Sequence, residues 1–402
     1  MPKKLGWLYP YALLYFFFII VAFYFPDVAP MADEGIHLNQ IERIYSGDFS
    51  VHPALTTIPG YHWLMALLTM PFDHIGVVLV RRLNAFLALG TVTILMMLTY
   101  QVRKAVCASR LTQLVFLPIA LPFYFLIYTD SLSLMLILLC LSLGLSQRLF
   151  LAAVVGTLSI GVRQNNIVWL AMMPFLIYAT QGGKWKWPPL KQFLWRCWPF
   201  SICAAAFLTF YIINGGVAMG DQWAHPAFRF YCGNFFFLLL VYAALFFPGI
   251  IARLPQTWAY VRSQPALPQL LALLFAVYLF GFNNTHPYNQ IYAEYFLRNA
   301  VLMEMVSSIW IKVLFFIPLL LALTDFVARC QGRPAWAVIG VFTVLAVLPA
   351  WLIEQRYYII PFVLMVLYRE EETPKIESLT SFYYVLLGVI FTYGMLTHRF
   401  FM

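Results

Sequence analysis

The segment MADEGIHLNQ, at positions 31–40, places two adjacent carboxylates and a histidine in a chain that is otherwise largely apolar. A carboxylate such as Asp33 or Glu34 can act as a general base that takes a proton from a hydroxyl group. Glu34 and His37, three residues apart on one helical face, could instead hold a divalent cation. The structural alternative is that Asp33 or Glu34 caps a surface helix, because the helix dipole stabilises a negative charge at its N-terminus.

The composition indicates an integral membrane protein. Of the 402 residues, 63% are hydrophobic and 10% are charged, and the mean hydropathy is +0.81. A soluble domain typically has about 25% charged residues. Long apolar runs alternate with short polar connections, so we predict an all-α polytopic protein with a single transmembrane domain over residues 1–402. The basic residues form no continuous stripe, so no nucleic-acid partner is expected, and the cysteine spacing suggests neither a zinc site nor a disulfide framework.

The hydropathy pattern predicts about 13 transmembrane helices. Their expected positions are 7–25, 77–100, 111–128, 130–147, 149–162, 167–180, 197–213, 232–252, 266–282, 309–327, 334–351, 357–368 and 380–397. The first run is too long for a signal peptide and lacks a small-residue cleavage site, so we expect it to remain as a membrane helix.

Charge separates across the predicted membrane. With Lys3 and Lys4 in the cytoplasm, most of the 25 basic residues fall on the cytoplasmic side, and all seven histidines fall on the outer side. This arrangement requires GYHWLMALLTM at 60–70, which is too short to cross, to lie as a helix at the outer surface. The first outer connection, 26–76, is then the longest non-spanning segment, and we predict that it is a catalytic loop.

Other outer segments are also rich in polar groups. They are RRLN (81–84), YTD (128–130), RQNN (163–166), NGGVAMGDQWAHPAFRF (214–230), NNTHPYNQIYAEYFLRN (283–299) and EQRYYIIP (354–361). Ionisable groups at or inside span ends are costly and usually face a cavity or one another. The residues in such positions are Arg81, Arg82, Asp130, Arg163 and Arg356. We expect them to line one outward-facing site.

These motifs carry a family resemblance. DEGIHLNQIERIYSGDFS, LTTIPGY, RRLN, YTD, RQNNIVW, NGGVAMGDQWAH, HPY and EQRYYIIP cover positions 33–361. In order and approximate spacing they resemble the dolichyl-phosphate-glucose α-1,2-glucosyltransferases, which add the last glucose to the lipid-linked oligosaccharide for asparagine glycosylation. The Asp-Glu opening and the later PGY are also similar to the C-type glycosyltransferase superfamily. The resemblance implies a C-type fold in the endoplasmic reticulum membrane with a lumenal active site, or, for a bacterial member, an inner-membrane protein with a periplasmic site.

The sequence departs from the family pattern in places. Gly35-Ile36-His37 stands where the family usually has a Phe before the His, and Ile58-Pro59-Gly60 stands where it has Pro-Pro-Gly. The stretch after HPY lacks the Asn-Arg-His-Tyr run of the family. A bacterial polyprenyl-phosphate-sugar transferase that modifies an envelope glycolipid is therefore an alternative function.

The resemblance implies an inverting transfer of glucose from a polyprenyl phosphate. The leaving phosphate is a stabilised anion, so one general base is sufficient, and we predict Asp33 for this role with Glu34 as the alternative. Arginine binds phosphate well because its planar fork reaches two oxygens. The predicted phosphate ligands are Arg356, Arg163 and Arg82, although structural ion pairs with Asp130 or Glu354 are an alternative role for the first two.

The remaining predicted site residues would bind the sugar or the acceptor. They are His37, Asp130, Gln164, Asn165, Asp221, Trp223, His225, His286, Tyr288 and Glu354. No cofactor is expected, because a departing monophosphate leaves little charge for a metal to neutralise, and a divalent ion is the alternative. A transporter or lipid flippase is an alternative of another class, but these proteins tend to have internal repeats, and we find none in this sequence.

Overall fold

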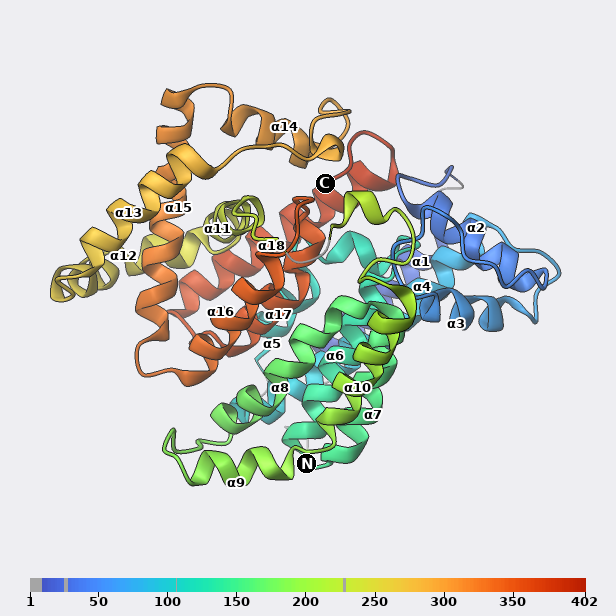
Figure 1. Ribbon diagram of the computed structural model, residues 1–402, viewed down its shortest axis with the longest axis horizontal. Helices are drawn as coiled ribbons and strands as arrows, with labels where there is room; N and C mark the ends of the chain where they lie inside the picture. Colours follow the sequence, from blue (N-terminus) through green and yellow to red (C-terminus); the bar gives the residue numbers. More distant parts are fainter. Residues whose placement is uncertain (1–8, 25–27, 106, 227–228) are drawn as a thin grey trace.

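The structure is a computed structural model that describes residues 9–24, 28–105, 107–226 and 229–402. Within these ranges all regular secondary structure is helical and no β-strand forms, which confirms the predicted all-α class. Figure 1 shows a helical assembly with α2 and α3 at one side and α12, α13 and α15 at the other. Lys3, Lys4, both ends of the expected span 7–25 and positions 26–27 of the predicted catalytic loop lie outside the described residues.

Among the described residues, three helices are long and apolar enough to cross a membrane. They are α4 (Val77–Arg103), α15 (Ile309–Cys330) and α18 (Pro374–Leu396). The number rises to five if two bent pairs each count as one span. These pairs are α9 (Pro189–Arg196) with α10 (Phe200–Asn214), bent by 61°, and α11 (Gly233–Leu245) with α12 (Phe247–Ser263), bent by 96°. The chain is therefore a helical membrane protein.

The other helices are shorter. They are α1 (Tyr9–Phe23), α2 (Glu34–Tyr45), α3 (Gly60–Thr69), α5 (Ala108–Val115), α6 (Asp130–Leu145), α7 (Leu149–Val162), α8 (Ile167–Thr180), α13 (Leu267–Gly281), α14 (Leu297–Met305), α16 (Pro334–Val347) and α17 (Ile359–Tyr368). Single 3₁₀ turns include η2 (Leu121–Tyr124), η3 (Gln164–Asn166), η4 (Gln222–Ala224), η5 (Pro287–Asn289) and η6 (Gln355–Tyr358). The bounds of α7 and α8 coincide with the expected spans 149–162 and 167–180.

Two expected spans are not continuous helices. The span expected at 111–128 is divided, because α5 ends at Val115 and only η2 follows. Pro118 and Pro122 lie in this stretch, and proline has no N–H to continue a helical ladder. The span expected at 232–252 bends by 96° where α11 ends and α12 begins, and Pro248 stands in the first turn of α12.

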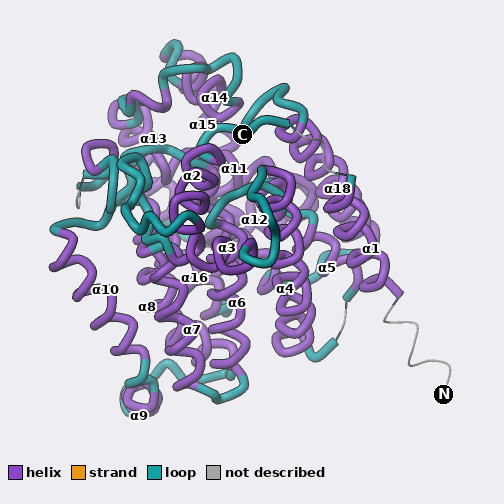
Figure 2. The backbone as a smooth tube through the Cα atoms, turned by 90° about the vertical axis from the view of Figure 1, so that its right-hand side faces the viewer, coloured by secondary structure: helices purple, strands orange, loops and turns teal. Residues whose placement is uncertain are grey.

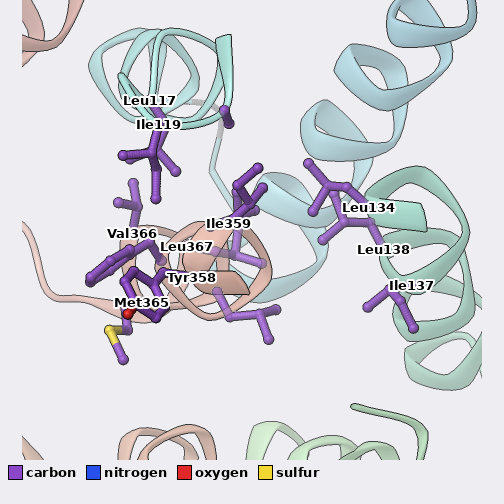
Figure 3. Close-up of a cluster of buried hydrophobic side chains, with 14 of the residues drawn as sticks. Leu117, Ile119, Leu134, Ile137, Leu138, Tyr358, Ile359, Met365, Val366 and Leu367 are labelled. Carbon is purple, nitrogen blue, oxygen red and sulfur yellow. The ribbon is translucent and has the colours of Figure 1, made fainter. Parts of the chain in front are cut away.

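Helix α17 lies in the middle of the core. Nearly all of its residues are buried, as expected for a helix that is apolar on every side. Figure 3 shows its side chains between Leu117 and Ile119 on one side and Leu134, Ile137 and Leu138 of α6 on the other. The 3₁₀ turn η6 leads directly into this helix, so the core fixes the position of the residues just before it.

Helices α2 and α3 pack against each other within the segment that we predict to be the first outer connection. The helix expected at 60–70 is present as α3, and it packs on α2 through a small apolar core that includes Ile41, Tyr61 and Met65. Figure 2 shows α9 at the opposite end of the molecule from the C-terminus. Lys191 and Arg196 of α9 therefore lie at one end of the molecule. Phe401, next to the C-terminus, lies at the other end.

Candidate active site

Arg356 is the central cation of the site. It belongs to η6, directly before the buried helix α17, and its side chain is 10% exposed. Its Nε donates a hydrogen bond to Glu354 at 2.7 Å, and its Nη2 donates to the Asp33 carboxylate at 2.9 Å. The guanidinium carbon lies 4.7 Å from the centre of the Tyr128 ring, a cation–π contact. The core thus holds one arginine where two carboxylates and an aromatic face converge.

Two further arginines complete a charged cluster around it. Arg163 pairs with Asp130, and Arg298 donates to Glu354 at 3.0 Å. The second carboxylate oxygen of Asp130 lies 3.8 Å from Arg356 and has no hydrogen-bond partner among the described residues. The outer cluster, as we name it, consists of Asp33, Asp130, Glu354, Arg163, Arg298 and Arg356.

The cluster keeps its buried members charged. Burial alone would raise the pKa of the Glu354 carboxyl, but Arg356 and Arg298 lower it to about 2. Burial disfavours the charge of Arg356, yet Glu354, Asp33 and Asp130 hold its pKa well above the usual range. Opposite charges within a few ångströms stabilise both ionised forms.

Two cavities meet at this cluster. The loop cavity, about 300 Å³, is lined by residues from the outer connections, including Asp33, His37 and Asp221. The helix cavity, about 220 Å³, extends between helices and is lined by apolar residues such as Trp169 of α8 and Phe207 of α10. The residues that line both cavities are Thr56, Thr57, Arg163, His225, Arg356 and Tyr357. Two arginines therefore stand on the shared wall.

Asp33 is the accessible carboxylate of the outer cluster. Its side chain is 48% exposed, against 4% for Asp130 and 6% for Glu354. It occupies the N-cap position of α2, but its side chain makes no capping hydrogen bond. Its backbone N–H instead donates to the hydroxyl of Tyr128 at 3.1 Å. The backbone of Asp33 is anchored, and its carboxylate lines the loop cavity.

Glu34, the alternative base, lies elsewhere. It is fully buried, and its carboxylate accepts hydrogen bonds from Arg81 at 3.0 and 2.5 Å. The backbone N–H groups of Met31 and Ile127 donate to the same carboxylate. A carboxylate that accepts these four hydrogen bonds from three residues, and that lines neither cavity, holds the start of α2 to α4. This position favours Asp33 over Glu34 as the base, and the alternative of Glu34 stays a prediction.

Arg82 also lies away from the cavities. Its Nε donates to the carbonyl of Ala22 at 3.2 Å, and its guanidinium lies 5.9 Å from the Phe23 ring. Successive residues of a helix point about 100° apart, so Arg81 and Arg82 face different neighbours. Its side chain faces α1 and lines neither cavity, so the structure does not support Arg82 as a phosphate ligand, and that role stays a prediction.

Gln164 connects two outer segments rather than projecting freely. Its amide nitrogen donates to the carbonyls of Thr56 and Val217 at 2.8 and 2.7 Å, and its amide oxygen accepts from the N–H of Ile58 at 3.3 Å. Its neighbour Asn165 is exposed and lines the helix cavity. Gln164 thus fixes the cavity wall.

The other predicted sugar-binding residues gather around Asp221 and Tyr288, which line the loop cavity, whereas Trp223 and His286 line neither cavity. Asp221 accepts a hydrogen bond from the Tyr288 hydroxyl at 2.9 Å, and both residues line the cavity. The Trp223 ring packs against Tyr288 and stacks on His286, with ring centres 5.4 and 6.5 Å away. His225 lines both cavities, and burial lowers its pKa although Glu354 and Asp221 oppose the shift. Exposed aromatic and carboxylate groups of this kind suit a sugar.

The structure adds residues that the sequence analysis did not select. Arg298 was within the polar segment 283–299, but nothing in that segment distinguished it from its neighbours. Tyr128 belongs to the YTD motif, and its ring contacts both Arg356 and His37. His62 of α3 contacts His37, and the spacing of the two in sequence gives no signal of this contact.

No group of three or more His, Cys, Asp or Glu side chains is arranged as a metal site in the part of the chain that the structure describes. The proposed pair of metal ligands does not converge, because Glu34 faces Arg81 while His37 faces His62.

Comparisons with known proteins agree with the motifs. The model of the DIE2/ALG10 family matches residues 27–188 and 176–367 of the chain. A Drosophila melanogaster relative is 27% identical over 295 positions, and the alignment covers 64% of each chain. A human relative is 25% identical and is covered over 83% of each chain. An Arabidopsis thaliana relative is 23% identical, over 93% of this chain and 91% of its own. No solved structure gives a significant match.

Each of these relatives is named Dol-P-Glc:Glc(2)Man(9)GlcNAc(2)-PP-Dol alpha-1,2-glucosyltransferase. The chain spans less than two thirds of the Drosophila relative and most of the other two. The two segments that match the family model together cover most of the sequence. The resemblance predicted from the motifs is therefore confirmed, and the chain belongs to the DIE2/ALG10 family.

Proposed function

We propose that this protein is an inverting glycosyltransferase that moves glucose from dolichyl, or another polyprenyl, phosphate to a lipid-linked oligosaccharide and forms an α-1,2 linkage. The name of its relatives specifies this donor, acceptor and linkage. The single observation that carries the proposal is the position of the Asp33 carboxylate, 2.9 Å from Arg356 where the two cavities meet. The Asp33 carboxylate, as proton acceptor, and the Arg356 guanidinium, as phosphate-binding cation, are thus close enough to contact the same substrate.

The arginines on the shared wall bind the donor phosphate. Arg356 and Arg163 line both cavities, so a phosphate between them projects its sugar into the loop cavity and its lipid into the helix cavity. Apolar side chains, among them Trp169, Phe207 and Leu345, line the helix cavity and suit an isoprenoid chain. The phosphate takes over the Arg356 contact that Asp33 makes in this structure, because a guanidinium fork binds two phosphate oxygens.

Asp33 then acts as the general base. Its carboxylate accepts the proton of an acceptor hydroxyl while the hydroxyl oxygen bonds to the anomeric carbon and the bond from that carbon to the phosphate oxygen breaks. The lipid phosphate leaves with the bonding electron pair, and the arginines stabilise its charge. The β-linked donor gives an α product because attack is from the opposite face. Asp221, His225, Tyr288 and Trp223 surround the acceptor sugar.

This reaction needs no cofactor, because the two arginines neutralise a monophosphate leaving group. The protein has the C-type fold, in which the shorter apolar helices also cross the bilayer to give about 13 spans. It forms one domain, with residues 26–76 as the catalytic loop. Its membrane is that of the endoplasmic reticulum, with the site on the lumenal side, where the acidic and histidine-rich connections lie.

Transfer by purified protein tests the proposal. Labelled polyprenyl-phosphate glucose and an acceptor that ends in two glucoses are incubated with the wild type, with Asp33→Asn and with Asp73→Asn, each with and without chelator. Asp73 is an exposed carboxylate of the same outer connection and is the matched control. We expect chelator-resistant transfer by the wild type and the control, and loss of roughly 10³-fold or more in Asp33→Asn. Full activity of Asp33→Asn would refute Asp33 as the base.

A further inference from the structure

Two histidines from different helices meet beside the loop cavity. His37 of α2 lines the cavity, and His62 of α3 lies behind it, fully buried. His37 Nδ1 and His62 Nε2 are 2.9 Å apart, and the rings stack with centres 5.1 Å apart and planes 28° apart. The reaction as proposed above gives this pair no role.

Burial favours the neutral form of both imidazoles. Burial, and then His62, Arg356 and Arg163, lower the pKa of His37 well below its usual value. Burial lowers the pKa of His62 to about 3, although the Pro59 carbonyl opposes the shift. In a neutral imidazole one nitrogen donates and the other accepts, so only one of the two facing nitrogens carries the shared hydrogen.

The surroundings of His62 decide which nitrogen carries it. Its Nδ1 is buried and has no hydrogen-bond partner among the described residues, and the Pro59 backbone raises the pKa of the ring. A backbone carbonyl can only accept a hydrogen bond, so it favours an N–H on the ring nitrogen that does not face His37. This environment favours the tautomer with the hydrogen of His62 on Nδ1, in which His62 Nε2 accepts from His37 Nδ1.

This tautomer leaves a lone pair on His37 Nε2, at the edge of the ring away from His62. Two aromatic rings hold the imidazole in this orientation. The centres of Tyr128 and Tyr61 lie 5.3 and 6.3 Å from that of His37, and both rings are nearly perpendicular to it. The loop cavity thus receives a fixed neutral acceptor whose direction a second histidine sets.

We propose that His37 Nε2 forms a hydroxyl-binding subsite, which accepts a hydrogen bond from an acceptor-sugar hydroxyl next to the one that Asp33 deprotonates. His62 is a positioning residue that fixes His37 in the required tautomer. The inference rests on the proposed function for the identity of the sugar. Its chemistry follows from the site, because the neighbouring Arg356 and Arg163 offer only donors, and a sugar hydroxyl that donates needs an acceptor.

Four variants and a control test the subsite by separate KM values for donor and acceptor. His37→Phe keeps a ring without an acceptor, and His37→Gln restores an amide oxygen. We expect His37→Phe to lower kcat/KM for the acceptor roughly 10- to 100-fold while the donor KM stays within about 2-fold. His37→Gln should recover part of this loss. His74→Phe alters an exposed histidine and should match the wild type.

The same comparison isolates the role of His62. His62→Phe preserves packing but cannot accept from His37, and we expect the same acceptor-specific loss in a smaller degree. His62→Gln places an amide oxygen opposite His37 Nδ1 and should restore activity. A wild-type acceptor KM in His37→Phe would overturn the proposal. Equal changes of both KM values in His62→Phe, with a lower unfolding temperature and no rescue by Gln, would reduce His62 to a packing residue and overturn its positioning role.

A spectroscopic measurement separates this inference from the proposed function. In protein with ¹⁵N-labelled histidine, the signals of His37 are assigned by their loss in His37→Gln. We expect a protonated Nδ1 and an unprotonated Nε2 on His37 near neutral pH. The opposite tautomer, or a cationic ring, would overturn the inference. Failure of the wild type to transfer glucose would count against the proposed function alone. The ¹⁵N measurement would still show whether His37 Nε2 is the unprotonated nitrogen that the inference requires.

Discussion

Two buried clusters of charge lie at opposite ends of α17 and differ in access. The basal cluster, which we define as Arg110, Gln113, Arg369 and Glu377, joins the first turn of α18 to α5. Arg369 donates two hydrogen bonds to the Glu377 carboxylate, at 2.8 and 2.6 Å, and the Gln113 amide donates a third to the same carboxylate at 2.9 Å. None of its four members lines the loop cavity or the helix cavity. This cluster is closed and serves to join elements.

The outer cluster has similar groups in a different state. Its Asp33 side chain is 48% exposed, one Asp130 oxygen has no hydrogen-bond partner among the described residues, and two of its arginines line both cavities. Unsatisfied atoms alone do not separate the two clusters, because Arg110 Nε and Nη2 of the basal cluster are also buried without a hydrogen-bond partner among the described residues. A charge that lines a cavity can exchange its partner for a ligand, whereas a charge closed off from both cavities cannot do so without loss of stability. Burial of charge therefore does not by itself identify a site, and access to a cavity is the distinguishing property.

The largest effect that this comparison predicts is on catalysis at Arg356. Arg356→Met should reduce transfer by roughly 10³-fold, since it removes the cation that faces the leaving phosphate. Arg356→Lys should lose roughly 100-fold, because an ammonium cannot bind two oxygens as a fork. Initial rates of monodisperse protein measure both, with Arg43→Met on the exposed face of α2 as the control. A near-normal rate for Arg356→Lys would show that the phosphate is bound elsewhere.

The basal cluster should respond in the opposite way. Glu377→Gln leaves Arg369 buried without its carboxylate, and we expect a loss of about 3–5 kcal/mol in the free energy of unfolding. Activity per folded molecule should stay within about 2-fold of the wild type, because no cavity is altered. Thermal unfolding in detergent and transfer rates of the folded fraction measure the two quantities. A large drop in activity per folded molecule would contradict the claim that the basal cluster serves the fold and not the transfer reaction.

Acid should weaken the outer cluster through Glu354. Its pKa is about 2 in the folded protein, below the ordinary 4.5, so its charge stabilises the fold above about pH 4.5. We expect this contribution, about 3 kcal/mol, to be lost progressively as the pH falls from about 4.5 to 2, and to be constant from pH 5 to 8. Unfolding temperatures measured across this range test the prediction. The slope should be smaller in Glu354→Gln, and an unchanged slope would assign the effect to other carboxylates.

The smallest expected effects concern the packing that supports the outer cluster. A Cβ on Gly60 of α3 would stand 2.4 Å from the Gly161 carbonyl oxygen of α7, so Gly60→Ala must displace α3 and should cost about 1–3 kcal/mol. Gly35 of α2 has open space around it, and Gly35→Ala should stabilise by about 0.5–1 kcal/mol. Unfolding temperatures and acceptor KM values of the pair test the idea. Equal behaviour of the two variants would show that the contact between α3 and α7 does not position the site.

The sequence predicts much of the fold because long apolar runs impose helices. It also contains the signals for the breaks that we missed, since Pro118, Pro122 and Pro248 stand inside the two expected spans that are interrupted. The mean hydropathy of a long window changes little when one residue is a proline, so hydropathy alone does not show where a helix is interrupted. The surface helix at 60–70 was predicted because its short length excluded a span.

The candidate site was predictable where ionisable residues occur in an apolar setting. Asp33, Arg163 and Arg356 were selected for this reason, and they lie together. Sequence alone could not decide between Arg81 and Arg82, because rotation by one helical position determines whether a side chain meets Glu34 or α1. Contacts such as His37 with His62 depend on how α2 packs on α3, which periodicity does not specify.

Gln164 has a consequence for how the family can vary. All three of its hydrogen bonds are to backbone atoms, at positions 56, 58 and 217. Side chains at those positions can therefore be exchanged during evolution without breaking the bonds, whereas replacement of Gln164 would break all three at once. The Gln164 amide thus allows the sequences of the surrounding loops to change while the cavity wall keeps its shape. This is compatible with relatives that share only 23–27% of their residues with this chain.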